Sequence, residues 1–190
     1  MAHPISSQIS PSMSAPPLDE SQVPADARAV LEINLDALRT NWAHLNEVAG
    51  RAECAGVIKA DAYGLGLVEI AGALMREGCR TFFVATLHEG RRLRAVDPSA
   101  TIYILDGLLP GAEAPYAGFD LRPVLSSLAE IRDWARFCRS ENRKRPAAIH
   151  VDTGMNRLGL PADEVEALSA ATDRPLDDFA VALVMSHLLN

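Results

Sequence analysis

The chain has 190 residues, 48% of them hydrophobic, and a formal net charge of −7 at pH 7. This composition supports a packed core and excludes a disordered protein, and the acidic balance provides no basic surface for nucleic acid or for an anionic membrane. The three cysteines, Cys54, Cys79 and Cys138, have no metal-site spacing and indicate reduced thiols in a cytoplasmic protein.

The first 28 residues are rich in proline and serine, including Pro16, Pro17 and Pro24. They lack the apolar run of a secretory signal, so we interpret residues 1–28 as a disordered N-terminal tail. No segment approaches the roughly 20 apolar residues that cross a bilayer, and we therefore expect no association with membranes.

Residues 29–190 carry alternating strand and helix patterns, and we interpret them as part of a single domain. Residues 29–35 alternate apolar and polar side chains, which predicts a half-exposed strand. Asp36 is placed to cap a helix that follows, because apolar residues then recur at helical spacing, namely Leu38, Trp42, Leu45 and Val48.

Six further strands are predicted, at residues 55–59, 81–85, 101–105, 121–125, 146–151 and 179–186, with helices or long connections between them. Repeated strand–helix units form a parallel sheet, which could be a flat doubly wound sheet or a (β/α)8 barrel. Six units are too few for a complete barrel. Because the last strand runs almost to Asn190, we interpret the chain as cut within a domain.

The strongest chemical signal is the run Ile-Lys-Ala-Asp-Ala-Tyr-Gly-Leu-Gly at residues 58–66. Lys59 stands at the carboxyl end of a buried strand, where α/β enzymes place reactive groups. Desolvation there favours the neutral amine, which can form a Schiff base with a carbonyl cofactor or substrate. Tyr63 lies in a glycine-bracketed turn as a possible hydrogen-bond donor, and Asp61 is expected to cap or turn this loop.

This run resembles the cofactor-attachment signature of alanine racemases, which is a lysine, then Ala-Asp-Ala-Tyr-Gly, a variable residue and glycine. The resemblance implies that Lys59 holds pyridoxal 5′-phosphate (PLP) as a Schiff base and is a catalytic base, and that Tyr63 bonds the PLP phosphate. It also implies a (β/α)8 TIM-type barrel, here incomplete with about six βα units and without the family's C-terminal β-domain.

A second segment, residues 150–160, resembles the family's Val-Asp-Thr-Gly-Met-x-Arg-Leu-Gly element. Strand alternation places His150 and Asp152 on one face, and a turn at Gly154 can bring Arg157 back over the strand end. The resemblance implies that Arg157 lies near the PLP phenolic oxygen and the substrate carboxylate. Many family members have a lysine, often carbamylated, at the position of His150, so another anion must hold Arg157 here.

A third segment, Met185-Ser186-His187, resembles the family's Thr/Ser-His pair, which implies that His187 lies against the cofactor ring. The alternative for His187 is a strand-end histidine bonded to the backbone. We interpret Trp42 and Trp134 as packing residues from their helical spacing. A further three arginines, Arg91, Arg92 and Arg94, indicate a solvated helix face rather than an anion site.

The resemblance implies a cytoplasmic isomerase, homodimeric at full length, that interconverts L-alanine and D-alanine and supplies D-alanine for peptidoglycan. The family's second acid/base is a tyrosine of the β-domain, so we expect the 190-residue chain alone to racemise alanine poorly or not at all. The alternatives are an amino-acid racemase of broader or serine specificity, a non-catalytic PLP-binding barrel protein, and a degenerate remnant without function.

Overall fold

A computed structural model describes residues 23–188 of the chain. Most of the predicted tail, residues 1–22, lies outside the described residues. Residues 23–34 contain no helix or strand, so the strand predicted at residues 29–35 is wrong. No strand lies beside this segment among the described residues, and an extended segment needs a neighbouring strand to hydrogen-bond its backbone groups.

The sheet has six parallel strands arranged in the order of the sequence. They are β1 (Gly56–Val57), β2 (Thr81–Val84), β3 (Thr101–Ile104), β4 (Arg122–Leu125), β5 (Pro146–His150) and β6 (Ala180–Met185). A doubly wound sheet reverses its strand order at a switch point, whereas a barrel adds each new strand beside the previous one. The observed order therefore selects the barrel type, of which the six predicted strands are present, the first five of them followed by helices among the described residues.

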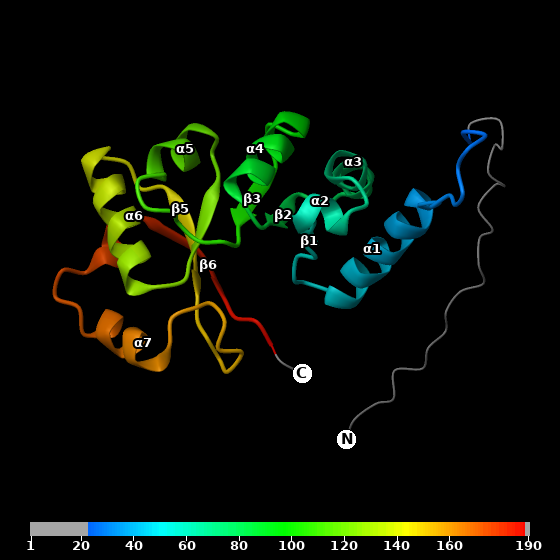
Figure 1. Cartoon of the computed structure of the whole chain (residues 1–190). Helices are drawn as coiled ribbons and strands as arrows, with labels where there is room; N and C mark the ends of the chain where they lie inside the picture. The colour runs from blue at the N-terminus through cyan, green and yellow to red at the C-terminus, as the bar shows by residue number, and fades with distance from the viewer. Residues whose placement is uncertain (1–22, 189–190) are drawn as a thin grey trace, which may run out of the picture.

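The helices form an arc around the outside of the strands, and α1 packs against α3 at one end of it (Figure 1). They are α1 (Leu35–Ala49), α2 (Lys59–Tyr63), α3 (Leu67–Glu77), α4 (Leu87–Val96), α5 (Glu113–Gly118), α6 (Leu128–Ser140) and α7 (Ala162–Ser169), with a 3-10 turn, η2, at Pro175–Asp177. The short helices α2 and α5 were not predicted, because neither is long enough to display an apolar period.

The main core lies between the strands and this outer layer of helices. Alternate strand residues such as Phe82, Ile104 and Ile149 enter it, together with the fully buried Trp134 of α6. The residues between them face the inner side of the sheet, where a smaller cluster forms around Tyr103, Val124 and Ala148. This division follows from the period of two along a strand, and it leaves the inner side for polar groups at the strand ends.

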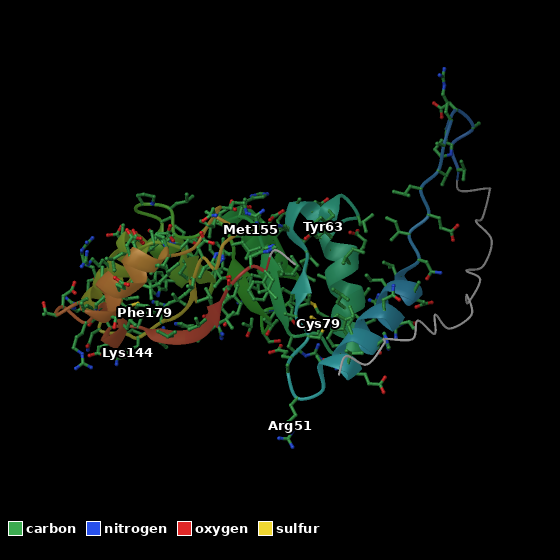
Figure 2. The ribbon with its side chains drawn as sticks, turned by 90° about the horizontal axis from the view of Figure 1, so that it is seen from below. Arg51, Tyr63, Cys79, Lys144, Met155 and Phe179 are labelled. Atoms are coloured by element: carbon green, nitrogen blue, oxygen red, sulfur yellow. The ribbon has the colours of Figure 1, made fainter. Side chains whose placement is uncertain are left out.

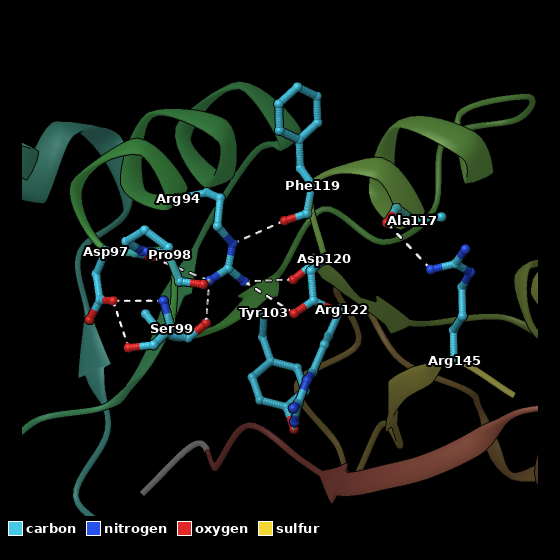
Figure 3. A network of polar contacts seen from close by, with 11 residues as sticks. Arg94, Asp97, Pro98, Ser99, Tyr103, Ala117, Phe119, Asp120, Arg122 and Arg145 are labelled. Atoms are coloured by element: carbon cyan, nitrogen blue, oxygen red, sulfur yellow. Dashed lines mark hydrogen bonds and ion pairs between the residues drawn. The ribbon is translucent and has the colours of Figure 1, made fainter.

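Helix α1 is formed as predicted, but the prediction that Asp36 caps it is wrong: the helix begins at Leu35, and the Asn34 side chain accepts the capping hydrogen bond from the N–H of Ala37. Trp42 is buried, whereas Leu45 and Val48 of the same periodic stripe are exposed. The interpretation of Arg94 as a solvated residue is wrong. Its guanidinium donates to backbone carbonyls on two connections, including those of Ala100 and Asp120, and links the α4–β3 connection to the α5–β4 connection (Figure 3).

Candidate functional site

The carboxyl ends of the parallel strands share one edge of the sheet. Figure 2 shows Tyr63 and Met155, which follow β1 and β5, along one side of the molecule. The opposite side carries residues that precede strands β1, β2, β5 and β6, namely Arg51, Cys79, Lys144 and Phe179. The loops after β1, β5 and β6, which carry the predicted site residues, therefore emerge at the edge where barrel enzymes place their active sites.

The segment after Lys59 is a left-handed turn. Ala60, Asp61, Ala62 and Tyr63 have φ angles between 52° and 57°, and none of them is glycine. Such a conformation costs roughly 1–2 kcal/mol per residue, so a run of four requires compensating contacts. The predicted tight turn is present. It is formed by residues 60–63 themselves, and not by the flanking glycines alone.

Helix α4 holds this turn from the side. Glu89 is only 8% exposed, and its Oε1 accepts a hydrogen bond from the backbone N–H of Asp61 at 3.1 Å. The Asp61 carboxylate accepts from the N–H of Leu67, the first residue of α3, at 3.1 Å and pairs with Arg92 at 3.0 Å, so it closes the loop after Lys59, as expected for this residue. Sequence analysis missed Glu89, although the capping-box spacing from Thr86 to Glu89 was available as a signal.

The Lys59 side chain is half-buried, and Tyr63 is 63% exposed. Among the described residues, neither side chain takes part in an ion pair or a hydrogen bond. The amine and the phenol thus project from a fixed backbone as donors without a protein acceptor in the described part of the chain.

The loop after β5 is closed on itself by its own backbone. Asp152 donates its N–H to the carbonyl of Leu160 at 2.9 Å, and its carboxylate accepts from the N–H groups of Gly154 and Asn156. These bonds hold the pKa of Asp152 below its usual value, because they favour the ionised form. The turn at Gly154 is formed as predicted, and it leads to Arg157, which is exposed and has no ion-pair partner in the described range.

His150 ends β5 and is 8% exposed. Burial is the main reason that its pKa is lowered; the nearby His187 and Arg157 lower it further, and Asp152 opposes them. These four groups, from the loops after β5 and β6, therefore influence one another electrostatically. The neutral His150 provides no anion for Arg157.

A side-chain hydrogen bond between Thr153 and Ser186 joins the loops after β5 and β6. His187 follows at once, is exposed, and contacts the carbonyl of Leu188 through Nδ1 at 3.0 Å. This is the kind of backbone contact that the alternative for His187 describes, and the imidazole stays exposed, so its position against a cofactor ring remains a prediction.

Along the carboxyl edge of the sheet, Arg157 and His187 lie together on the side of β5 and β6. Lys59 and Tyr63 lie on the side of β1. No hydrogen bond or ion pair between the two pairs occurs among the described residues, and four strands separate β1 from β6 in the sheet order. In residues 23–188, no cluster of His, Cys, Asp and Glu side chains could hold a metal ion. No helix in that range has the length and apolar character to cross a membrane.

Six parallel strands in sequence order, an outer layer of helices and a lysine at the carboxyl end of β1 define an α/β protein of the barrel class. Residues 33–190 match the family described as alanine racemase, N-terminal domain, and the chain belongs to that family.

Curated relatives agree with this assignment. The chain is 56% identical over 162 residues to an alanine racemase of Methylobacterium sp. (strain 4-46), with 85% of this chain and 44% of the relative covered. It is 46% identical over 165 residues to a catabolic alanine racemase of Mesorhizobium japonicum, with 86% and 43% covered. The chain therefore spans about half the length of the curated relatives it matches.

Solved structures give the same result. An alanine racemase from Bartonella henselae with covalently bound pyridoxal phosphate superposes with a TM-score of 0.80 at 40% identity, covering 83% of this chain and 46% of that one. The enzyme from Streptomyces lavendulae superposes with a TM-score of 0.72 at 29% identity, covering 81% and 41%.

Proposed function

We propose that this chain forms the lysine-bearing part of a PLP-dependent alanine racemase. The observation that carries the proposal is Lys59 at the carboxyl end of β1, half-buried, without a partner in the described residues, on a turn held in a strained conformation. Strained backbone persists where the surrounding structure holds it, and it concentrates at ligand-binding sites.

The donor set fits PLP. Its aldehyde requires an amine, its phosphate and phenolic oxygen require hydrogen-bond donors or cations, and its ring requires a flat neighbour. Lys59 supplies the amine, Tyr63 a hydroxyl, Arg157 a guanidinium and His187 an imidazole. Neither Lys59 nor Arg157 forms an ion pair among the described residues, so both remain able to bind an anionic ligand.

When bound, PLP supplies an electron sink that acidifies the Cα proton of an attached amino acid. In our proposal Lys59 holds the cofactor through Nζ and later moves this proton between Nζ and Cα. Tyr63 binds the phosphate, Arg157 orients the phenolic oxygen and the substrate carboxylate, and His187 lies against the ring. Since burial lowers the pKa of His150, its neutral imidazole leaves the charge of Arg157 available to the ligand.

The substrate we propose is alanine, interconverted between its L and D forms to supply D-alanine for peptidoglycan. We also propose a cytoplasmic homodimer as the working assembly. The family membership supports these points, since relatives such as those of Methylobacterium and Mesorhizobium are named alanine racemases.

The chain offers a direct test because it has only two lysines, Lys59 and Lys144. The purified chain would be incubated with PLP, reduced with borohydride, digested and mapped by peptide mass. We expect the adduct on Lys59 at PLP concentrations that leave Lys144 unlabelled, because Lys144 is exposed and lies on the opposite side of the sheet. Lys59→Ala removes the adduct and Lys144→Arg, the matched control, preserves it. Equal labelling of both lysines, or none, contradicts the proposal.

A further inference from the structure

Glu89 connects two loops at the carboxyl edge of the sheet. Its Oε2 accepts from the N–H groups of Ala85 at 2.8 Å and Thr86 at 3.2 Å, in the loop after β2. Its Oε1 accepts from the N–H of Asp61 at 3.1 Å, in the loop after β1. One buried carboxylate thus satisfies three backbone donors, and the last of these lies two residues beyond Lys59.

The bond to Asp61 lies inside the left-handed turn. Because each non-glycine residue in this conformation is disfavoured, the turn relaxes unless contacts outside it hold it. Helix α4 provides two such contacts to Asp61, one from Glu89 to its N–H and one from Arg92 to its carboxylate. Both Lys59 and Tyr63 belong to this same helical segment, α2, so its conformation determines where their side chains start.

The same arrangement occurs at Glu130 of α6. Its Oε2 accepts from the N–H of Ser126 at 3.0 Å, after β4, and from the N–H of Leu108 at 3.3 Å, after β3. Burial is the main reason that the pKa of Glu130 is raised. Glu130, which is half-buried, is therefore a comparable carboxylate that bridges two neighbouring loops, and neither of these loops carries a proposed cofactor residue.

We propose that Glu89 is a positioning residue for the lysine-bearing turn, setting the approach of Lys59 and Tyr63 to PLP. This inference rests on the proposed function. The hydrogen bond from the N–H of Asp61 to Glu89, and not only the packing of α4, orients the turn.

Glu89→Gln isolates this bond without changing the shape of the side chain. The amide has a single oxygen, and the two N–H groups at the start of α4 retain it. The amide NH₂ then faces the N–H of Asp61, and two donors oppose each other. In Glu130→Gln, the matched control, one amide oxygen can still accept both bonds that Oε2 now accepts.

The experiment uses the full 190-residue chain and two readouts. The first is hydrogen–deuterium exchange of peptides covering residues 58–67, without PLP. The second is the PLP concentration that gives half-maximal borohydride-trapped adduct on Lys59. We expect E89Q to raise the exchange rate of this segment and the half-saturating PLP concentration by about tenfold or more, and E130Q to change both by less than about threefold. The melting temperature is measured alongside, and it should fall more for E89Q, which leaves the N–H of Asp61 without an acceptor, than for E130Q, which keeps both of its bonds.

The inference is overturned if residues 58–67 of E89Q exchange as in the wild type, if E89Q captures PLP at the wild-type concentration, or if E130Q shifts capture as strongly as E89Q. If the wild-type chain captures no PLP on Lys59, the proposed function fails by itself. The exchange readout then still decides the role of Glu89 in holding the turn.

Discussion

Replacing Gly159 by alanine tests how the Arg157 loop is held. Gly159 follows Arg157 by two residues and has a φ of +110°. A Cβ built there lies 2.7 Å from the backbone N of Asp152, 3.0 Å from the carbonyl carbon of Val151 and 3.1 Å from Cδ2 of His150. The two nearest of these atoms belong to the backbone and cannot turn away as a flexible side chain would.

Two effects add in this variant. A side chain at positive φ costs about 1–2 kcal/mol, and overpacking against atoms that cannot move costs about 1–3 kcal/mol. We therefore expect Gly159→Ala to lower the free energy of unfolding by about 2–5 kcal/mol, a large share of the roughly 5–15 kcal/mol of a typical domain. Relief requires breaking the bonds from Asp152 to Leu160 at 2.9 Å and from Leu160 to His150 at 2.8 Å, which would release Arg157.

Urea unfolding followed by circular dichroism measures this change, with the midpoint compared at equal slope. The control is Gly118→Ala, since a Cβ at Gly118 meets nothing within 4 Å and its φ is not positive. Because Gly118 is the last residue of α5, Gly118→Ala should leave the free energy of unfolding unchanged or raise it by up to about 1 kcal/mol. A Gly159→Ala chain as stable as this control would refute the claim that close backbone approach holds the loop.

Three further outcomes are expected. Gly72→Ala should raise the free energy of unfolding by about 0.5–1 kcal/mol in the same urea titration, since a helical alanine is favoured over glycine and the added Cβ meets only Arg76, at 3.7 Å; no gain would contradict this. Burial raises the pKa of Cys79 to about 11, so iodoacetamide near neutral pH should alkylate the half-exposed Cys54 and spare Cys79 in the native chain, and equal labelling would oppose it. Because His150 has a lowered pKa in the fold, the unfolded chain binds its proton first, and stability should fall as pH drops below about 6.5; denaturant titrations across this range should give a smaller fall for His150→Gln, and an identical fall would exclude this contribution.

The proposed site separates into a turn at β1 and a pair of loops at β5 and β6. The first provides an amine and a hydroxyl, and the second a guanidinium and an imidazole. All of them lie on loops at the carboxyl edge of one parallel sheet. Because the sheet of a barrel curves, side chains from both sets of loops can contact one ligand. Arg157 forms no ion pair among the described residues, so the anion expected to hold it in place of a carbamylated lysine stays a prediction.

Much of this could be predicted from the sequence, because its information is local. The apolar period of each strand and helix depends on side chains two to four residues apart, so the six strands and helix α1 follow from it, with helices or long connections expected between the strands. The lysine-containing motif at residues 58–66 is likewise contiguous in sequence, and it indicated the family on its own. The strand predicted at residues 29–35 was wrong, since a strand exists only beside another strand.

The tertiary structure decided what depends on residues far apart in the chain. It selected a barrel-type strand order over a doubly wound one, because that choice lies in which strands pair. It assigned Arg94 to backbone carbonyls of two other connections, and Glu89 to the N–H of a residue 28 positions earlier. The physical reason is the same in each case: a buried polar group must find a partner, and only the packed chain determines which partner lies within reach.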